Sequence, residues 1–152
     1  MTTRCSPAAG PYPPPPHQLV GRSCHNQTEL TRLTTEHYAT ISPIWPTKTK
    51  PGYGPPLDVA GLGSLVRSSP VPLLALGGIE TPEQVTACVE AGAVGVAVLG
   101  ALMRAKDPAE TAATLTSAYA KAVTPKLTQT RHGVSQVPTS GLRPTLPTQG
   151  SS

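Results

Sequence analysis

Four short apolar runs cross the middle of the chain, and segments with helical periodicity follow them. The runs cover residues 18–23, 38–44, 71–76 and 94–100. The last two runs are continuous rather than alternating, which is typical of strands buried on both faces of a parallel sheet. We therefore predict four short strands, each followed by a helix.

The predicted helices carry recognisable end signals. In the clearest one, Thr81 is an N-cap, Pro82 takes the first helical position and Gly92 ends the helix. Asn26 followed by Glu29 resembles a capping box at the start of another. The predicted helices cover residues 26–37, 56–69, 81–92 and 107–122.

This alternation of strand and helix predicts an α/β fold with parallel strands and right-handed crossovers. Two architectures fit the pattern, a doubly wound sheet and part of a (β/α)8 TIM barrel. Four strand–helix units make half of such a barrel, so the second architecture predicts a half-barrel with two exposed sheet edges.

Composition sets the limits of this fold. The chain has 152 residues, of which 38% are hydrophobic and 19 are proline. Residues 1–17 and 123–152 are rich in proline and poor in apolar residues, so we predict disorder in both and one folded unit over 18–122. The net charge of +4 comes from scattered basic residues. This scatter argues against a nucleic-acid partner and suits a small anionic ligand.

The three cysteines, Cys5, Cys24 and Cys88, have neither metal-ligand spacing nor an even number for a disulfide framework. We expect reduced, unreactive thiols. No apolar stretch approaches the roughly 20 residues of a membrane span, and no signal peptide is recognisable. We therefore expect a cytoplasmic protein without a membrane partner.

Candidate chemistry follows each predicted strand. In parallel α/β folds the ligand lies at the carboxyl ends of the strands. Glycines let backbone approach an anion, and hydroxyl and ammonium groups suit phosphate oxygens. Four such loops at one end of a sheet favour a phosphorylated ligand. They contain Ser23 and His25; Thr47, Thr49 and Lys50; Gly77 and Gly78; and Leu99 and Gly100.

His25 allows two interpretations. It is a candidate acid or base near neutral pH, but the sequence favours a histidine hydrogen-bonded at a helix start. Cys24 beside it suggests a Cys–His nucleophile, but adjacent residues at a strand end point in opposite directions, which argues against that pairing.

Three segments resemble the thiamine-phosphate synthase family: VGRSCHNQTEL, YATISPIWPTKTKPGYGPPLDVAGL and VPLLALGGIETPEQVTACVEAGAVGVAVLGALMRAKDPAETAATL. The resemblance runs in order from about Leu19 to Leu115. Its most specific parts are the strand followed by PTKTK, the strand followed by GGI, and the AGAVGVAV strand. The related thiazole tautomerases share the barrel but usually depart from the PTxTK pattern.

The resemblance implies a (β/α)8 barrel enzyme, of which this chain would supply about strands 5–8. Such enzymes join hydroxymethylpyrimidine diphosphate to thiazole phosphate and release pyrophosphate and thiamine phosphate. By motif, Ser23 would contact the pyrimidine and Lys50 the pyrophosphate. The thiazole phosphate would be held by Thr47, Lys48, Thr49, Gly78, Leu99 and Gly100.

The resemblance also implies Mg²⁺, whose family ligands lie in a first half of the barrel that this sequence does not match. Of its eight acidic residues, only Glu80 follows a predicted strand, so we expect no magnesium site here. We accordingly expect a weakly active or inactive synthase-like chain. Two alternatives stay open: a thiazole tautomerase-like enzyme using His25, and a non-catalytic half-barrel that assembles, for example as a homo-oligomer, through its sheet edges.

Overall fold

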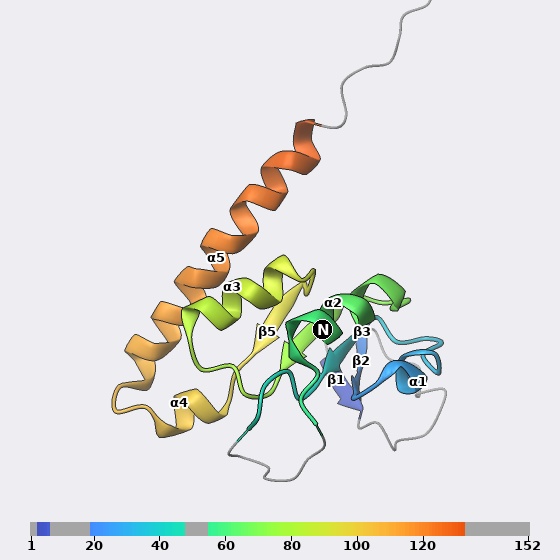
Figure 1. Cartoon of the computed structure of the whole chain (residues 1–152), viewed down its shortest axis with the longest axis horizontal. Coiled ribbons are helices and arrows are strands. Elements are labelled where there is room, and N and C mark those ends of the chain that lie inside the picture. Colours follow the sequence, from blue (N-terminus) through green and yellow to red (C-terminus); the bar gives the residue numbers. More distant parts are fainter. Residues whose placement is uncertain (1–2, 7–18, 48–54, 133–152) are drawn as a thin grey trace, which may run out of the picture.

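The computed structural model describes residues 3–6, 19–47 and 55–132, and it shows a parallel sheet with helices connecting its strands (Figure 1). The five strands lie in chain order, and each pairs in parallel with its neighbours. They are β1 (Thr3–Ser6), β2 (Leu19–Cys24), β3 (Tyr38–Ile41), β4 (Leu73–Leu76) and β5 (Gly95–Ala97). The helices are α1 (Gln27–Leu30), α2 (Asp58–Ser68), α3 (Pro82–Glu90), α4 (Gly100–Arg104) and α5 (Pro108–His132).

The predicted α/β fold and its parallel strands are confirmed. Proline limits two of the strands, because it has no N–H to donate to a ladder. Strand β4 begins after Pro72, whose carbonyl still accepts from Ala39 at 3.0 Å, and β3 ends before Pro43. Thr81 caps α3 as predicted, and the structure adds a full capping box in which Thr81 and Gln84 are bonded reciprocally.

One face of the sheet packs against helices to make the core. Side chains alternate between the two faces of a strand, so one residue in two points to the helices. On that face the strands contribute Ala39, Ile41, Leu73 and Ala75, and the helices contribute Leu62, Leu65, Val85, Cys88 and Leu115. The opposite face carries small, polar and half-buried side chains, including Ser23, Thr40 and Leu76.

The helix predicted over 26–37 is wrong for most of its length, since α1 spans only Gln27–Leu30. The chain after Leu30 turns instead and brings Glu36 against Arg22 of β2, with Nε and Oε1 2.5 Å apart. Both side chains are fully buried. The other carboxylate oxygen of Glu36 accepts the N–H groups of Thr34 and Thr35 at 2.9 and 3.2 Å. These bonds replace the partners that a continued helix would supply.

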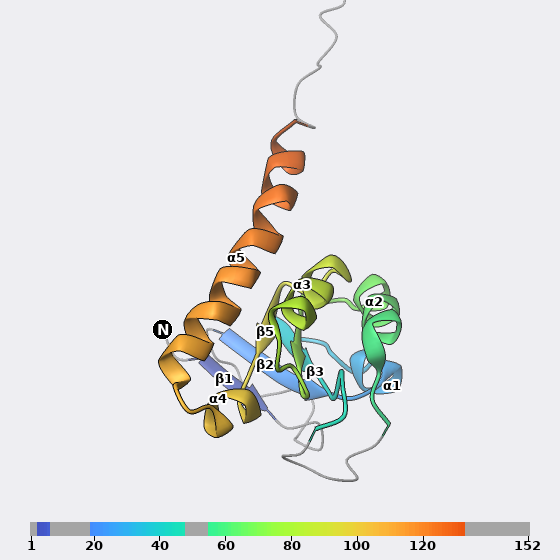
Figure 2. The same ribbon diagram turned by 60° about the vertical axis from the view of Figure 1, so that its left-hand side comes forward.

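The structure also differs from the prediction in both segments that were predicted to be disordered. Strand β1 lies within 1–17, the segment predicted to be disordered, and α5 continues ten residues past 122 to His132. The remaining residues of both predicted tails lie outside the described ones. Helix α5 runs beside α3, and its last turns extend beyond the body of the fold (Figures 1 and 2). In the described part of the chain, no helix combines the length and apolar character needed to cross a membrane.

The buried pair makes stability depend on pH. Burial raises the pKa of the Glu36 carboxyl, but hydrogen bonds from Arg22 and from backbone N–H groups outweigh burial and hold that pKa below its ordinary value. A depressed folded-state pKa gives stability that is present above the ordinary value of about 4.3 and lost as pH falls through the lower folded value.

We predict that Glu36→Gln lowers the free energy of unfolding at neutral pH by about 3 kcal/mol, because it leaves Arg22 buried without its counter-ion. The variant should also lose part of the acid dependence seen in the wild type. Urea unfolding across the acidic range measures both effects, with Glu90→Gln, at the exposed end of α3, as the matched control. An unchanged pH slope in Glu36→Gln would contradict this account.

Candidate functional site: a pocket at the carboxyl end of the sheet

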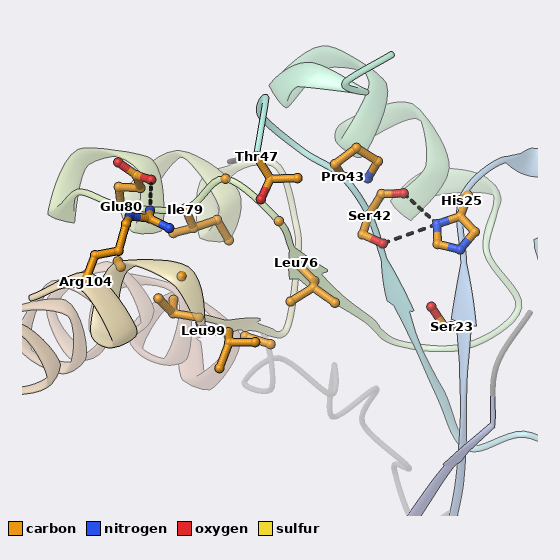
Figure 3. A pocket seen from close by; sticks show the side chains of 16 residues that line it. Ser23, His25, Ser42, Pro43, Thr47, Leu76, Ile79, Glu80, Leu99 and Arg104 are labelled. Atoms are coloured by element: carbon orange, nitrogen blue, oxygen red, sulfur yellow. Dashed lines mark hydrogen bonds and ion pairs between the residues drawn. The ribbon is translucent and has the colours of Figure 1, made fainter. Parts of the chain in front are cut away.

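A pocket of about 210 Å³ opens at the carboxyl ends of the strands, where the loops after β2, β3, β4 and β5 meet (Figure 3). Its lining is mostly apolar, with a few polar and charged groups, which is the usual character of a small-molecule site. It is lined by Ser23, His25, Ser42, Pro43, Thr47, Leu76, Gly77, Gly78, Ile79, Glu80, Ala97, Val98, Leu99, Gly100, Ala101 and Arg104.

Most of the predicted site residues meet in this pocket. Four separate loops bring them together, as expected for a parallel sheet. The predicted residues that line it are Ser23, His25, Thr47, Gly78, Leu99 and Gly100. The other three, Lys48, Thr49 and Lys50, lie outside the described residues.

The two glycines after β4 are required by the fold itself. Gly77 and Gly78 have φ angles of 94° and 74°, a conformation that residues with a Cβ rarely adopt. A Cβ on Gly78 would lie 2.5 Å from the carbonyl oxygen of Trp45. The carbonyl of Gly77 accepts the N–H groups of Ile44 and Trp45 at 3.2 and 3.1 Å. The glycines therefore allow the segment after β3, residues 43–45, to lie against the end of β4.

The same segment closes the base of the PTKTKPGYGPP loop. The N–H of Leu57 donates to the carbonyl of Pro43 at 2.9 Å, and that of Asp58 donates to Ile44 at 3.0 Å. Both ends of the loop are thus fixed next to the glycine turn. Thr47, the first residue of PTKTK after its proline, consequently lines the pocket.

His25 lies at the start of α1 and is hydrogen-bonded there, as one of its two interpretations predicts. Its backbone N–H donates to Glu29 Oε2 at 2.7 Å, and Asn26 caps the same short helix. Its Nδ1 lies 2.8 Å from the carbonyl oxygen of Ser42 and 3.2 Å from the hydroxyl. Because a carbonyl oxygen only accepts, we assign the Nδ1 proton to this bond, so Nε2 carries the lone pair of the neutral ring.

The sequence did not single out two polar groups of the pocket, Ser42 and Arg104, and it did not reveal the partner of Glu80. Ser42 fixes the His25 ring, and Glu80 of the glycine loop forms an ion pair with Arg104 of α4. The only local signal that Arg104 lies at the pocket was its spacing from Gly100, one helical turn earlier. Their partners are distant in sequence, so periodicity could not reveal them.

The described residues do not fit a magnesium site. They contain no group of three His, Cys, Asp or Glu side chains that could hold a metal ion. Glu80 supplies a carboxylate to the pocket, and Arg104 pairs with it.

Cys24 and Cys88 are buried, and burial raises the pKa of the Cys88 thiol to about 11, so both fit the predicted unreactive thiols.

A family model for thiamine monophosphate synthase matches residues 13–102. The chain belongs to this family. It is 36% identical over 106 residues to a thiamine-phosphate synthase of Levilactobacillus brevis, covering 68% of this chain and 48% of the relative. A thiamine-phosphate synthase of Salinispora tropica is 42% identical over 81 residues, 53% of this chain and 38% of the relative. The chain thus spans about half, or less, of these relatives.

A solved structure has the same fold. The thiamine phosphate pyrophosphorylase of Pyrococcus furiosus superposes with a TM-score of 0.58 at 22% identity, covering 69% of this chain and 50% of that one. At this identity the likeness concerns the fold alone. It places the chain's parallel sheet and helices within the fold of that larger protein.

We predict that Gly78→Ala destabilises the fold by about 2–4 kcal/mol, from left-handed strain and from overpacking against Trp45. Gly61→Ala is the matched control, because Gly61 is helical and a Cβ there would be 3.4 Å from its nearest neighbour, Leu57. The control should gain about 0.5–1 kcal/mol. Urea unfolding of both variants tests the contrast, and a Gly78→Ala variant as stable as wild type would show that the turn tolerates a side chain.

Proposed function

We propose that the chain performs the phosphate-binding part of thiamine-phosphate synthesis, the coupling of hydroxymethylpyrimidine diphosphate to thiazole phosphate. One observation carries this proposal: five residues assigned by family resemblance, from four loops, line a single pocket. Backbone N–H groups near Gly78, Leu99 and Gly100, with the hydroxyl of Thr47, would hold the thiazole phosphate. Ser23 would contact the pyrimidine, and Lys50 the leaving diphosphate.

We further propose that the sheet is half of a (β/α)8 barrel, with β2–β5 corresponding to its last four strands. The face opposite the helices supports this. The hydroxyl oxygen of Thr40 on that face is buried and has no hydrogen-bond partner among the described residues. Leu74 and Leu76 beside it are only partly buried. In a closed barrel, other strands would cover these groups.

Magnesium enters no step of this proposal, because the pocket offers Glu80 already paired with Arg104 and no second carboxylate within the described part. The residues present bind and orient a phosphorylated substrate. In the family's reaction pyrophosphate would leave before the thiazole nitrogen attacks, so positioning and charge stabilisation would be the protein's main contributions. We therefore propose that this chain alone has weak or absent turnover. We also propose that it acts on small molecules in the cytoplasm. A non-catalytic half-barrel that assembles through β1 and β5 is the structural alternative.

Calorimetric titration with thiazole phosphate, followed by an assay with both substrates and Mg²⁺, tests the proposal. We expect binding of thiazole phosphate, weakened about tenfold in Thr47→Val by loss of a hydrogen bond to a charged group. We expect little thiamine phosphate from the chain alone. Absence of binding would refute the proposed function, and rapid turnover would refute the proposed inactivity.

Thiazole tautomerisation is a second candidate, because the bond from His25 Nδ1 to Ser42 leaves Nε2 as the basic nitrogen of a residue that lines the pocket. Here we expect proton transfer to fall at least about a hundredfold in His25→Asn, the contribution typical of a general base. The readout is the rate of isomerisation of a thiazole carboxylate phosphate. A His25→Asn variant that keeps the wild-type rate, or a wild type without activity, would exclude this candidate.

A further inference from the structure

An ion pair spans the rim of the pocket between two of its loops (Figure 3). Arg104, in the last turn of α4, donates through a terminal nitrogen to Glu80, in the turn between β4 and α3. The two side chains are 43% and 44% exposed, and both line the pocket. The pair therefore lies at the entrance, in contact with solvent, and is not part of the core.

This ion pair determines how much positive charge the described lining of the pocket offers to an anionic ligand. Among its described lining residues, the other ionisable side chain is His25. While Arg104 and Glu80 are paired, their full charges cancel at the rim. A phosphorylated ligand would then meet little net positive charge from the described lining. If Glu80 releases the guanidinium, the positive charge and the donors of Arg104 become available to the ligand, although the net charge of the two residues stays zero.

Geometry brings Arg104 within reach of the pocket's inner surface. Gly100 and Arg104 are four residues apart in α4, so they occupy the same helix face, one turn apart. Glu80 follows Gly78 by two residues. The pair thus joins the two glycine-containing walls of the pocket. The planar guanidinium presents several donors that match phosphate oxygens, and half-exposed ion pairs are weakly held.

We propose that Arg104 is an anion-binding residue of the pocket and that Glu80 is its counter-ion in the unliganded state. A phosphate ester entering the pocket takes over the guanidinium donors and displaces the Glu80 carboxylate. Glu80 thereby lowers affinity for any phosphate that makes too few other contacts to compete. The inference rests on the proposed function only for its ligand class, a phosphate ester.

Titration of the full chain with inorganic phosphate at constant ionic strength, followed by phosphorus NMR, tests this directly. Arg104→Gln should weaken phosphate binding about tenfold, as expected for a lost charge-assisted hydrogen bond. Glu80→Gln should strengthen it about threefold, because Arg104 no longer has a competing carboxylate. Arg104→Lys should lie between wild type and Arg104→Gln, since it keeps the charge and loses the planar fork.

The double variant separates a direct role from a general effect of charge. If Glu80 acts by holding Arg104, Glu80→Gln changes nothing once Arg104 is glutamine. If Glu80 merely repels anions, it changes affinity equally in both backgrounds, and the proposed pairing role is wrong. Arg67→Gln and Glu90→Gln, which alter exposed charges outside the pocket, should bind phosphate as wild type does.

The outcomes are distinguishable from those of the synthase assay. Binding of inorganic phosphate that depends on Arg104, without binding of thiazole phosphate, supports this inference and counts against the proposed function. Binding of thiazole phosphate that is equal in wild type, Arg104→Gln and Glu80→Gln overturns the inference and leaves the function intact. If neither the wild type nor Glu80→Gln binds phosphate, the inference is overturned as well. Circular dichroism of each variant verifies that it is folded.

Discussion

The site depends on the close packing of the segment after β3 against the glycine turn after β4. Trp45 lies so near Gly78 that no side chain fits between them, and the carbonyl of Gly77 binds two N–H groups of that segment. The same segment accepts the first N–H groups of the chain entering α2. One small region of backbone therefore fixes the part of the pocket that is lined by Pro43, Gly77 and Gly78, and it fixes both ends of the PTKTKPGYGPP loop. The glycines serve this packing whether or not a phosphate is present.

The features that could be predicted from the sequence are those set by local chemistry. The four apolar runs predicted β2 to β5, and Thr81 with Pro82 and Gly92 predicted the limits of α3. Because parallel strands end at one edge, the candidate residues were also expected to lie together, and the six that the structure describes line one pocket. The family resemblance supplied their roles, which remain proposals.

The features that were missed depend on contacts between distant residues. The predicted helix over 26–37 had adequate periodicity, yet Glu36 reaches Arg22 and takes the backbone donors of Thr34 and Thr35. The pairing of Glu80 with Arg104 joins residues 24 apart in sequence. In the same way, the buried Thr40 hydroxyl, which has no hydrogen-bond partner among the described residues, could be recognised only once the sheet was formed. Local patterns specify elements, whereas such pairs are specified by the fold.

The central claim is that this pocket binds the phosphate of a thiazole phosphate. Amide chemical-shift mapping of the isotopically labelled chain during titration with that compound tests it most directly. The account predicts the largest shifts at Thr47, Gly78, Leu99 and Gly100, with a smaller change at the side chain of Arg104. Shifts confined to another surface, such as residues of α3 and α5, or no shifts at saturating ligand, would contradict it.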